Sequence, residues 1–155
     1  MRPQAEFIAL STLAGGVAMM FATALQQLSF GMLWSDTFKW ALPALPALVA
    51  AGIGAWLALR WQRRGDAPVP TRRSGGMAVR TVLLSALSYV PAVALYLAIA
   101  FAVSGGATAG RLDVLLLAVL FGCLPLLWAA VPFSMIEYVL CRRYLRRVRV
   151  PAGSP

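Results

Sequence analysis

The chain has 155 residues, of which 61% are hydrophobic and only 12% are charged, with a formal net charge of +9. A soluble domain carries about twice that charged fraction, so the composition argues against a soluble enzyme or a nucleic-acid-binding domain and favours an integral membrane protein. The sequence contains no histidine, the commonest metal ligand and proton shuttle, and we expect no metal site and no cofactor.

The first predicted membrane span covers residues 7–33, an uncharged stretch longer than the roughly 20 residues that a helix needs to cross hydrocarbon. Small side chains recur at every fourth position in its centre, where they allow another helix to approach closely. These candidate partner-contact residues are Ala14, Ala18 and Ala22. Gln26 and Gln27 near the far end are expected at the outer interface, with a polar pathway or contact as the alternative.

A cleaved secretory signal is a competing interpretation of this first span. Arg2, the apolar run and the pattern Ala22-Thr23-Ala24 fit such a signal, and cleavage would leave three spans. The apolar run is long for a signal, and this short pattern is easily found in an alanine-rich chain. The sequence therefore favours four spans over three.

The second predicted span covers residues 41–59 and follows a polar turn bracketed by Trp34 and Trp40, as expected at a headgroup interface. Pro43 and Pro46 fall in its first turns, where a missing N–H costs least. Small residues again form ladders here. Ala47, Ala51 and Gly54 complete the candidate partner-contact set. We expect this span to pack chiefly against the first one.

The stretch from Arg60 to Arg80 carries six arginines between two uncharged segments. Because such a segment cannot lie in hydrocarbon, we place residues 60–78 in a loop, with Gly75 and Gly76 freeing the chain before the next helix. Setting the orientation of the chain is the favoured role of these arginines. Contact with anionic lipid is the alternative, for Arg63, Arg64, Arg72 and Arg73.

The third predicted span covers residues 79–104 and has the most polar stripe of the four. Ser85 and Tyr89 share a helix face, and Tyr96 lies two turns beyond them. Pro91 removes a backbone hydrogen bond and is expected to kink the helix. The three hydroxyl residues are candidates for a polar pathway, while local packing is the favoured explanation of the stripe.

The fourth predicted span covers residues 113–140 and is followed by a basic tail at 141–155, into which the helix is expected to continue until Pro151. Glu137 completes the candidate polar pathway, although the favoured expectation is an interfacial carboxylate paired with nearby arginines. Cys123 and Cys141 lie about 27 Å apart on one helix, too far for a disulfide. Further candidate contacts for anionic lipid are Arg142, Arg143, Arg146 and Arg147.

The distribution of positive charge predicts how the chain sits in the membrane. Twelve lysines and arginines fall on the side of Arg2, the central loop and the tail, against two, Lys39 and Arg111, on the other. The positive-inside rule then places both termini in the cytoplasm. We therefore predict an all-α, single transmembrane domain over residues 1–155: a compact antiparallel bundle of four helices in a bacterial inner membrane, with spans one–two and three–four as adjacent hairpins.

Catalysis is not expected, because most of the five carboxylates lie in loops or at span ends and no nucleophile has a candidate base. The first expectation for function is a non-catalytic protein that binds a partner in the membrane, either as an accessory subunit or as an immunity protein against a membrane-inserting toxin. The partner would be another membrane protein or a second copy, and no nucleic acid. The alternative is a small oligomeric transporter or lipid-carrier translocator, which Glu137→Gln or Tyr89→Phe would inactivate.

Overall fold

The computed structural model describes residues 3–29, 44–64, 74–104 and 112–149. Within these ranges the chain is entirely helical, which confirms the predicted all-α class. The helices are α1 (Pro3–Ser29), α3 (Ala44–Arg64), α4 (Ser74–Ser104) and α5 (Leu112–Arg149). All four are long and apolar enough to cross a membrane. The described chain therefore has the makeup of a multi-pass membrane protein.

The helices extend further into the basic segments than the predicted spans. Helix α3 continues to Arg64 and α4 begins at Ser74, so the loop predicted at residues 60–78 is wrong at both ends. At the end of α3, arginine is a good helix former and allows the helix to continue. At the start of α4, the N–H groups of the first turn have no partner within the helix in any case, so Gly75 and Gly76 are tolerated there. As expected, α5 runs through the basic tail to Arg149. Residues 30–33 and 41–43 of the predicted spans lie outside the described residues.

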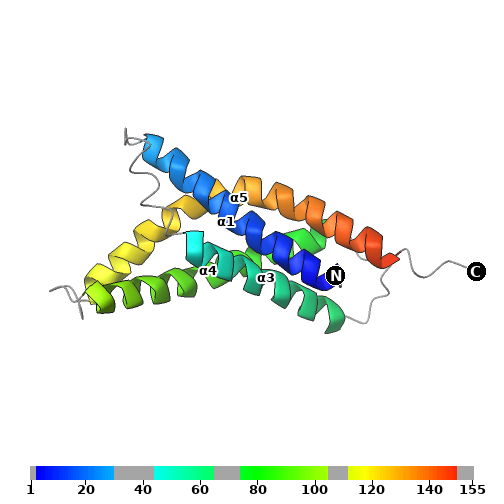
Figure 1. Ribbon diagram of the computed structural model, residues 1–155, viewed down its shortest axis with the longest axis horizontal. Helices are drawn as coiled ribbons and strands as arrows, with labels where there is room; N and C mark the ends of the chain where they lie inside the picture. Colours follow the sequence, from blue (N-terminus) through cyan, green and yellow to red (C-terminus); the bar gives the residue numbers. More distant parts are fainter. Residues whose placement is uncertain (1–2, 30–43, 65–73, 105–111, 150–155) are drawn as a thin grey trace, which may run out of the picture.

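Each helix packs against two others, in the cyclic order α1, α3, α4, α5. Helices that follow one another in the described chain run in opposite directions (Figure 1). The adjacent hairpins expected from the sequence are thus present. Helix α3 packs more extensively against α4 than against α1, so the expectation that it packs chiefly against the first span is wrong.

Glycine explains the closeness of α3 and α4. A Cβ built at Gly54 would lie 2.6 Å from the backbone nitrogen and 2.7 Å from the Cα of Ser85, so only glycine fits there. Gly15 has a similar role between α1 and α3, because an added Cβ would collide with the side chain of Ala51. In lipid, helices associate largely through such close packing, since there is no hydrophobic driving force between them.

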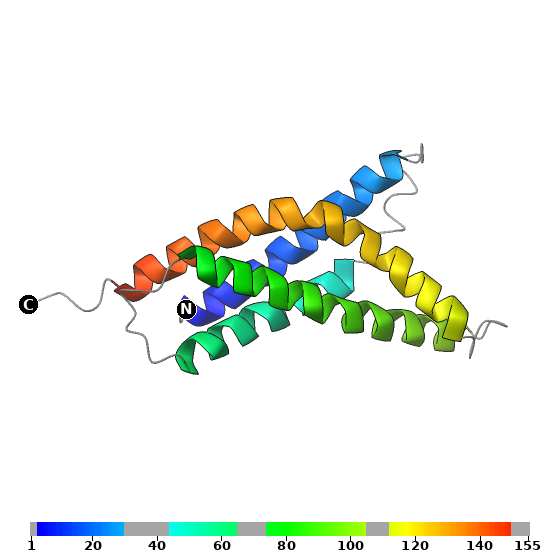
Figure 2. The same cartoon turned by 180° about the vertical axis from the view of Figure 1, so that it is seen from behind.

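The two ends of the bundle differ in shape (Figures 1 and 2). At one end, here called the basic end, the first residues of α1 and α4 lie together with the last residues of α3 and α5. At the other, here called the open end, the last turns of α1 diverge from the pair formed by α4 and α5. Helix α5 also changes direction between its yellow and orange parts, in the stretch that contains Pro125 and Pro132. Proline removes a helical hydrogen bond and is a common cause of such bends.

Candidate functional site

A layer of polar side chains crosses the interior of the bundle. Glu137 of α5, Ser11 of α1 and Thr81 of α4 are all 0% exposed, and Ser85 of α4 is buried one turn further along. Three helices therefore turn polar groups toward one another in the protein interior. Buried polar groups are costly in hydrocarbon and commonly have a functional reason to be there.

Glu137 reaches the interior because of its place on α5. It occupies the central position of a stripe at four-residue spacing that is buried throughout: Ala129, Phe133, Glu137, Cys141 and Leu145. Four arginines of the tail fall between these positions and are exposed: Arg142, Arg143, Arg146 and Arg147. Residues four apart lie on one face of a helix. When the apolar residues of this face are buried, Glu137 is therefore buried with them. This spacing was visible in the sequence and is the signal that indicates a buried glutamate.

The carboxyl group of Glu137 has no hydrogen-bond partner on either oxygen. The hydroxyl of Ser11 lies beside it from α1 without reaching hydrogen-bond geometry. The thiol of Cys141 lies near both Glu137 and Thr81, and the Thr81 hydroxyl already donates to the carbonyl of Met77, at 3.0 Å. The expected pairing of Glu137 with arginines is therefore not present among the described residues, because burial on α5 keeps the carboxyl away from the described arginines of the tail.

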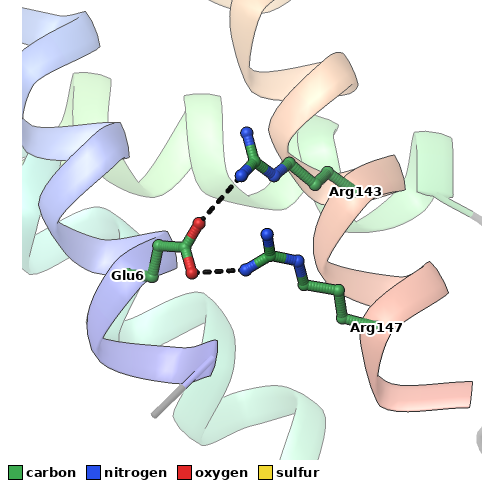
Figure 3. A network of polar contacts seen from close by, with 3 residues as sticks. All are labelled: Glu6, Arg143 and Arg147. Carbon is green, nitrogen blue, oxygen red and sulfur yellow. Dashed lines mark hydrogen bonds and ion pairs between the residues drawn. The ribbon is translucent and has the colours of Figure 1, made fainter. Parts of the chain in front are cut away.

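The arginines that were expected near Glu137 bind another carboxylate. Figure 3 shows Glu6 of α1 accepting from Arg143, at 3.1 Å, and from Arg147 of α5. Beside these ion pairs, the rings of the adjacent residues Phe7 and Tyr144 pack with centroids 5.3 Å apart. An apolar cluster then fills the space between these contacts and the polar layer. Its largest members are Phe7, Leu59, Met77 and Leu145.

Glu137 lies five positions before Arg142, and Ser85 lies five positions after Arg80. At 1.5 Å per residue, the polar layer is about 7.5 Å inside the level of these exposed arginines. Together with the apolar cluster, this depth separates the carboxyl from the basic end. Glu137 is therefore shielded by packing on that side.

Toward the open end, the bundle contains two cavities. The inner cavity has a volume of about 180 Å³, and its walls are apolar apart from Ser85 and Tyr89. The hydroxyl of Ser85 has no hydrogen-bond partner. Phe133, which precedes Glu137 by one turn, is also in its wall. The inner cavity thus begins one helical turn from the buried carboxyl.

The outer cavity is larger, about 430 Å³, and lies between α1, α4 and α5. Thr23, Gln26 and Tyr96 provide its polar atoms, and Phe101 and Phe121 contribute aromatic rings. Between the two cavities, the Tyr89 hydroxyl donates to the carbonyl oxygen of Gly122 at 3.0 Å. A Cβ at Gly122 would lie 3.2 Å from Val93, so α4 and α5 are also close there. Sequence reasoning did not identify Gly122, whose role depends on a carbonyl oxygen.

The residues predicted to form a polar pathway lie in sequence along this axis. Tyr96 lines the outer cavity, Tyr89 and Ser85 line the inner one, and Glu137 lies one turn beyond it. Gln26, expected at the outer interface, also lines the outer cavity. The structure thus brings the four predicted residues into one column through the bundle. Whether substrate passes along it stays a prediction.

The residues predicted to contact a partner have a different place in the structure. All are buried and pack within the chain itself: Ala14, Ala18, Ala22, Ala47, Ala51 and Gly54. In this conformation they face other helices of the same chain, and contact with a partner stays a prediction. The close approach that small residues allow is used here between helices of the same chain.

The arginines predicted to contact anionic lipid are only partly described. Four of them are exposed at the basic end: Arg142, Arg143, Arg146 and Arg147. The side chains of Arg63, Arg64, Arg72 and Arg73 lie outside the described residues. Arg143 and Arg147 also bind Glu6, so their charge is partly compensated within the protein. Contact with lipid headgroups stays a prediction for all eight.

Among the described residues that line the two cavities, tyrosine is the only ionisable type. In the part of the chain that the structure describes, no three potential metal ligands come together. The chain matches no family model, no curated protein and no solved structure. Its function must therefore be argued from the column that leads from Tyr96 to Glu137.

Proposed function

We propose that the protein is a small translocator of the membrane in which Glu137 binds and releases a proton during each transport cycle. This is the second of the two functions expected from the sequence. The observation that carries it is the full burial of the Glu137 carboxyl with no donor to either oxygen. Carboxyl groups inside membrane-spanning helices are costly, and they commonly mark proton relays and ion pathways.

The surroundings of Glu137 favour a proton as its counter-charge. The groups that face it are the hydroxyl of Ser11 from α1 and the thiol of Cys141 from its own helix, next to Thr81 of α4. At the same level α3 contributes Ala55, which is apolar and fully buried. No cationic side chain of the described residues neutralises the carboxylate there. A buried carboxylate without a cation binds a proton to lose its charge.

The cavities provide the access that proton exchange requires. They begin one helical turn from Glu137 and extend toward the open end, whereas the apolar cluster and the Glu6 ion pairs fill the basic end. The two sides of Glu137 therefore differ in the described residues, with cavities on one side and close packing on the other. A translocator alternates such access between its two sides.

Infrared difference spectroscopy on the purified protein in detergent tests this proposal directly. A pH jump should change the carbonyl band of a protonated carboxylic acid, and Glu137→Gln should abolish that change. Glu6→Gln is the matched control, because it removes an exposed carboxylate on α1 and should leave the band intact. A wild-type band that persists in Glu137→Gln contradicts the proposal. Reconstituted vesicles with an internal pH dye should show the same dependence on Glu137 for proton uptake.

Binding a membrane partner, as an accessory subunit or an immunity protein, is the second candidate function. The observation that favours it is Trp128, which is 63% exposed on α5 and fourteen positions before Arg142. That spacing places it about 21 Å inside the arginine level, near the middle of a bilayer, whereas tryptophan prefers the headgroup interface. A partner helix would cover it. Trp128→Leu should then abolish co-purification of the partner or of a second, differently tagged copy, with Tyr138→Leu as an exposed aromatic control.

We also propose that the basic end faces the cytoplasm of a bacterium, with the protein in the inner membrane. The exposed arginines of α3, α4 and α5 at this end support that orientation, because positive charge is retained on the cytoplasmic side. A reporter enzyme fused after Pro155 should be active only in its cytoplasmic form. Activity of a periplasm-specific reporter at that position contradicts the orientation.

A further inference from the structure

The outer cavity has the chemistry of a ligand site. Its volume of about 430 Å³ falls in the range of small-molecule pockets, roughly 300–1,000 Å³. Such pockets are mostly apolar and contain a few polar groups that orient the ligand. Here the apolar part includes the rings of Tyr96, Phe101 and Phe121, and the side-chain amide of Gln26 is the main polar group.

The electrostatics of this cavity favour one sign of charge. None of the described residues that line it is an arginine or a lysine, so an anion would find no counter-charge among them. Aromatic rings present a negative face, which attracts organic cations such as quaternary ammonium groups. Further along the same column, the Ser85 hydroxyl is buried without a partner, and beyond it lies the uncompensated carboxyl of Glu137. Both the cavity and the interior beyond it are therefore suited to a positive charge and unsuited to a negative one.

From these observations we propose that the outer cavity binds a hydrophobic organic cation, and that such cations are the substrates of the translocator. This inference rests on the proposed function of Glu137 and adds the class of substrate. The aromatic rings bind the cation first. When the cation reaches the carboxyl, Glu137 loses one proton and gains one monovalent cation, so the charge of the buried site does not change. The hydrogen bond from Tyr89 to Gly122 joins a residue of the inner cavity wall to one of the outer cavity wall, and in this proposal it opens when the cation passes.

Two ions of equal size and opposite charge test the inference sharply. The probes are tetraphenylphosphonium and tetraphenylborate, measured by equilibrium dialysis against the full-length protein in a neutral detergent. The cation should bind saturably, and the anion should not. Equal binding of the two ions, or the absence of saturable binding of the cation, would overturn the inference.

Variants of the cavity wall locate the site. Tyr96→Leu and Phe121→Leu keep apolar bulk and remove a ring, and each should weaken binding of the cation by about three- to thirtyfold. Tyr138→Leu is the matched control, because Tyr138 is an exposed tyrosine of α5 that lies outside both cavities. It should bind like the wild type. Wild-type affinity in both cavity variants, with the helical circular dichroism unchanged, would overturn the assignment to this cavity.

Proton release separates failure of this inference from failure of the proposed function. In unbuffered solution, cation binding should release protons from the wild type and should release none from Glu137→Gln. If the infrared signal of Glu137 is present and the cation does not bind, the substrate class is wrong and the proton-binding function stands. If the cation binds to the cavity and Glu137→Gln changes neither proton release nor the infrared band, the proposed function is wrong.

Discussion

The basic end and the open end of this bundle solve the same packing problem in opposite ways. At the basic end four helices meet, and the space between them is filled by Phe7, Leu59, Met77 and Leu145. At the open end the described walls of the outer cavity come from α1, α4 and α5, which enclose about 430 Å³ that side chains do not fill. Among the described residues, the bundle is therefore filled at one end and hollow at the other.

The two carboxylates Glu6 and Glu137 also have different surroundings. Glu6 is partly exposed and receives two guanidinium groups, whereas Glu137 is fully buried and receives none. An exposed ion pair contributes little to stability, while a buried unpaired carboxyl lowers it. A chain under selection for stability alone would place an apolar residue at position 137. This contrast is the physical basis of the functional role assigned to Glu137.

The largest expected effect on stability concerns the close contact between α3 and α4. Gly54→Ala should lower the free energy of unfolding by about 2 kcal/mol, because the new Cβ collides with the backbone of α4 at Ser85. Gly76→Ala is the matched control, since a Cβ there meets nothing within 4 Å, and it should be neutral or slightly stabilising. Unfolding by increasing fractions of a denaturing detergent, followed by circular dichroism, measures both. Similar midpoints for the two variants would mean that α3 and α4 are not in close contact.

The next effect is an increase in stability, and it tests the contrast between Glu6 and Glu137. Glu137→Met should raise the free energy of unfolding by about 1–3 kcal/mol, because it replaces an unpaired buried polar group by an apolar one of similar length. The same variant should lose proton binding. The same detergent titration measures the stability, and a destabilised Glu137→Met would show that the carboxyl has a partner that supports the fold.

The smallest effect concerns the ion pairs of the basic end. Glu6→Gln should lower the free energy of unfolding by only about 0.5 kcal/mol, and the difference from the wild type should shrink in high salt. Arg146→Gln controls for the loss of one charge, because Arg146 makes no ion pair with the described residues and should show no such salt dependence. A large, salt-independent loss in Glu6→Gln would mean that the contact is buried.

Substitution of the small residues Ala18 and Gly54 by leucine would not be a clean test of partner binding. Both residues are buried inside the bundle, so leucine at either position would damage the fold before it reported on any partner. The exposed Trp128 provides a cleaner test, because its substitution leaves the interior of the chain unchanged.

The sequence alone determined the helices and their alternation with basic segments. Long uncharged stretches and arginine clusters encode these features locally, since burial in lipid depends on composition over about 20 residues. The positions of Ser85, Tyr89 and Tyr96 on one helix also followed from periodicity. The helix ends did not, because arginine and first-turn glycine are compatible with either helix or loop.

Only the tertiary structure decided which faces meet. It turned the small-residue ladders of α1 and α3 inward, and it buried Glu137 while leaving Arg142 and Arg143 exposed. It also left two cavities beside the polar column. A residue's spacing fixes its face on its own helix, but the rotation of that helix depends on packing against its two neighbouring helices. For that reason a carboxyl next to the tail arginines in sequence lies away from them in space.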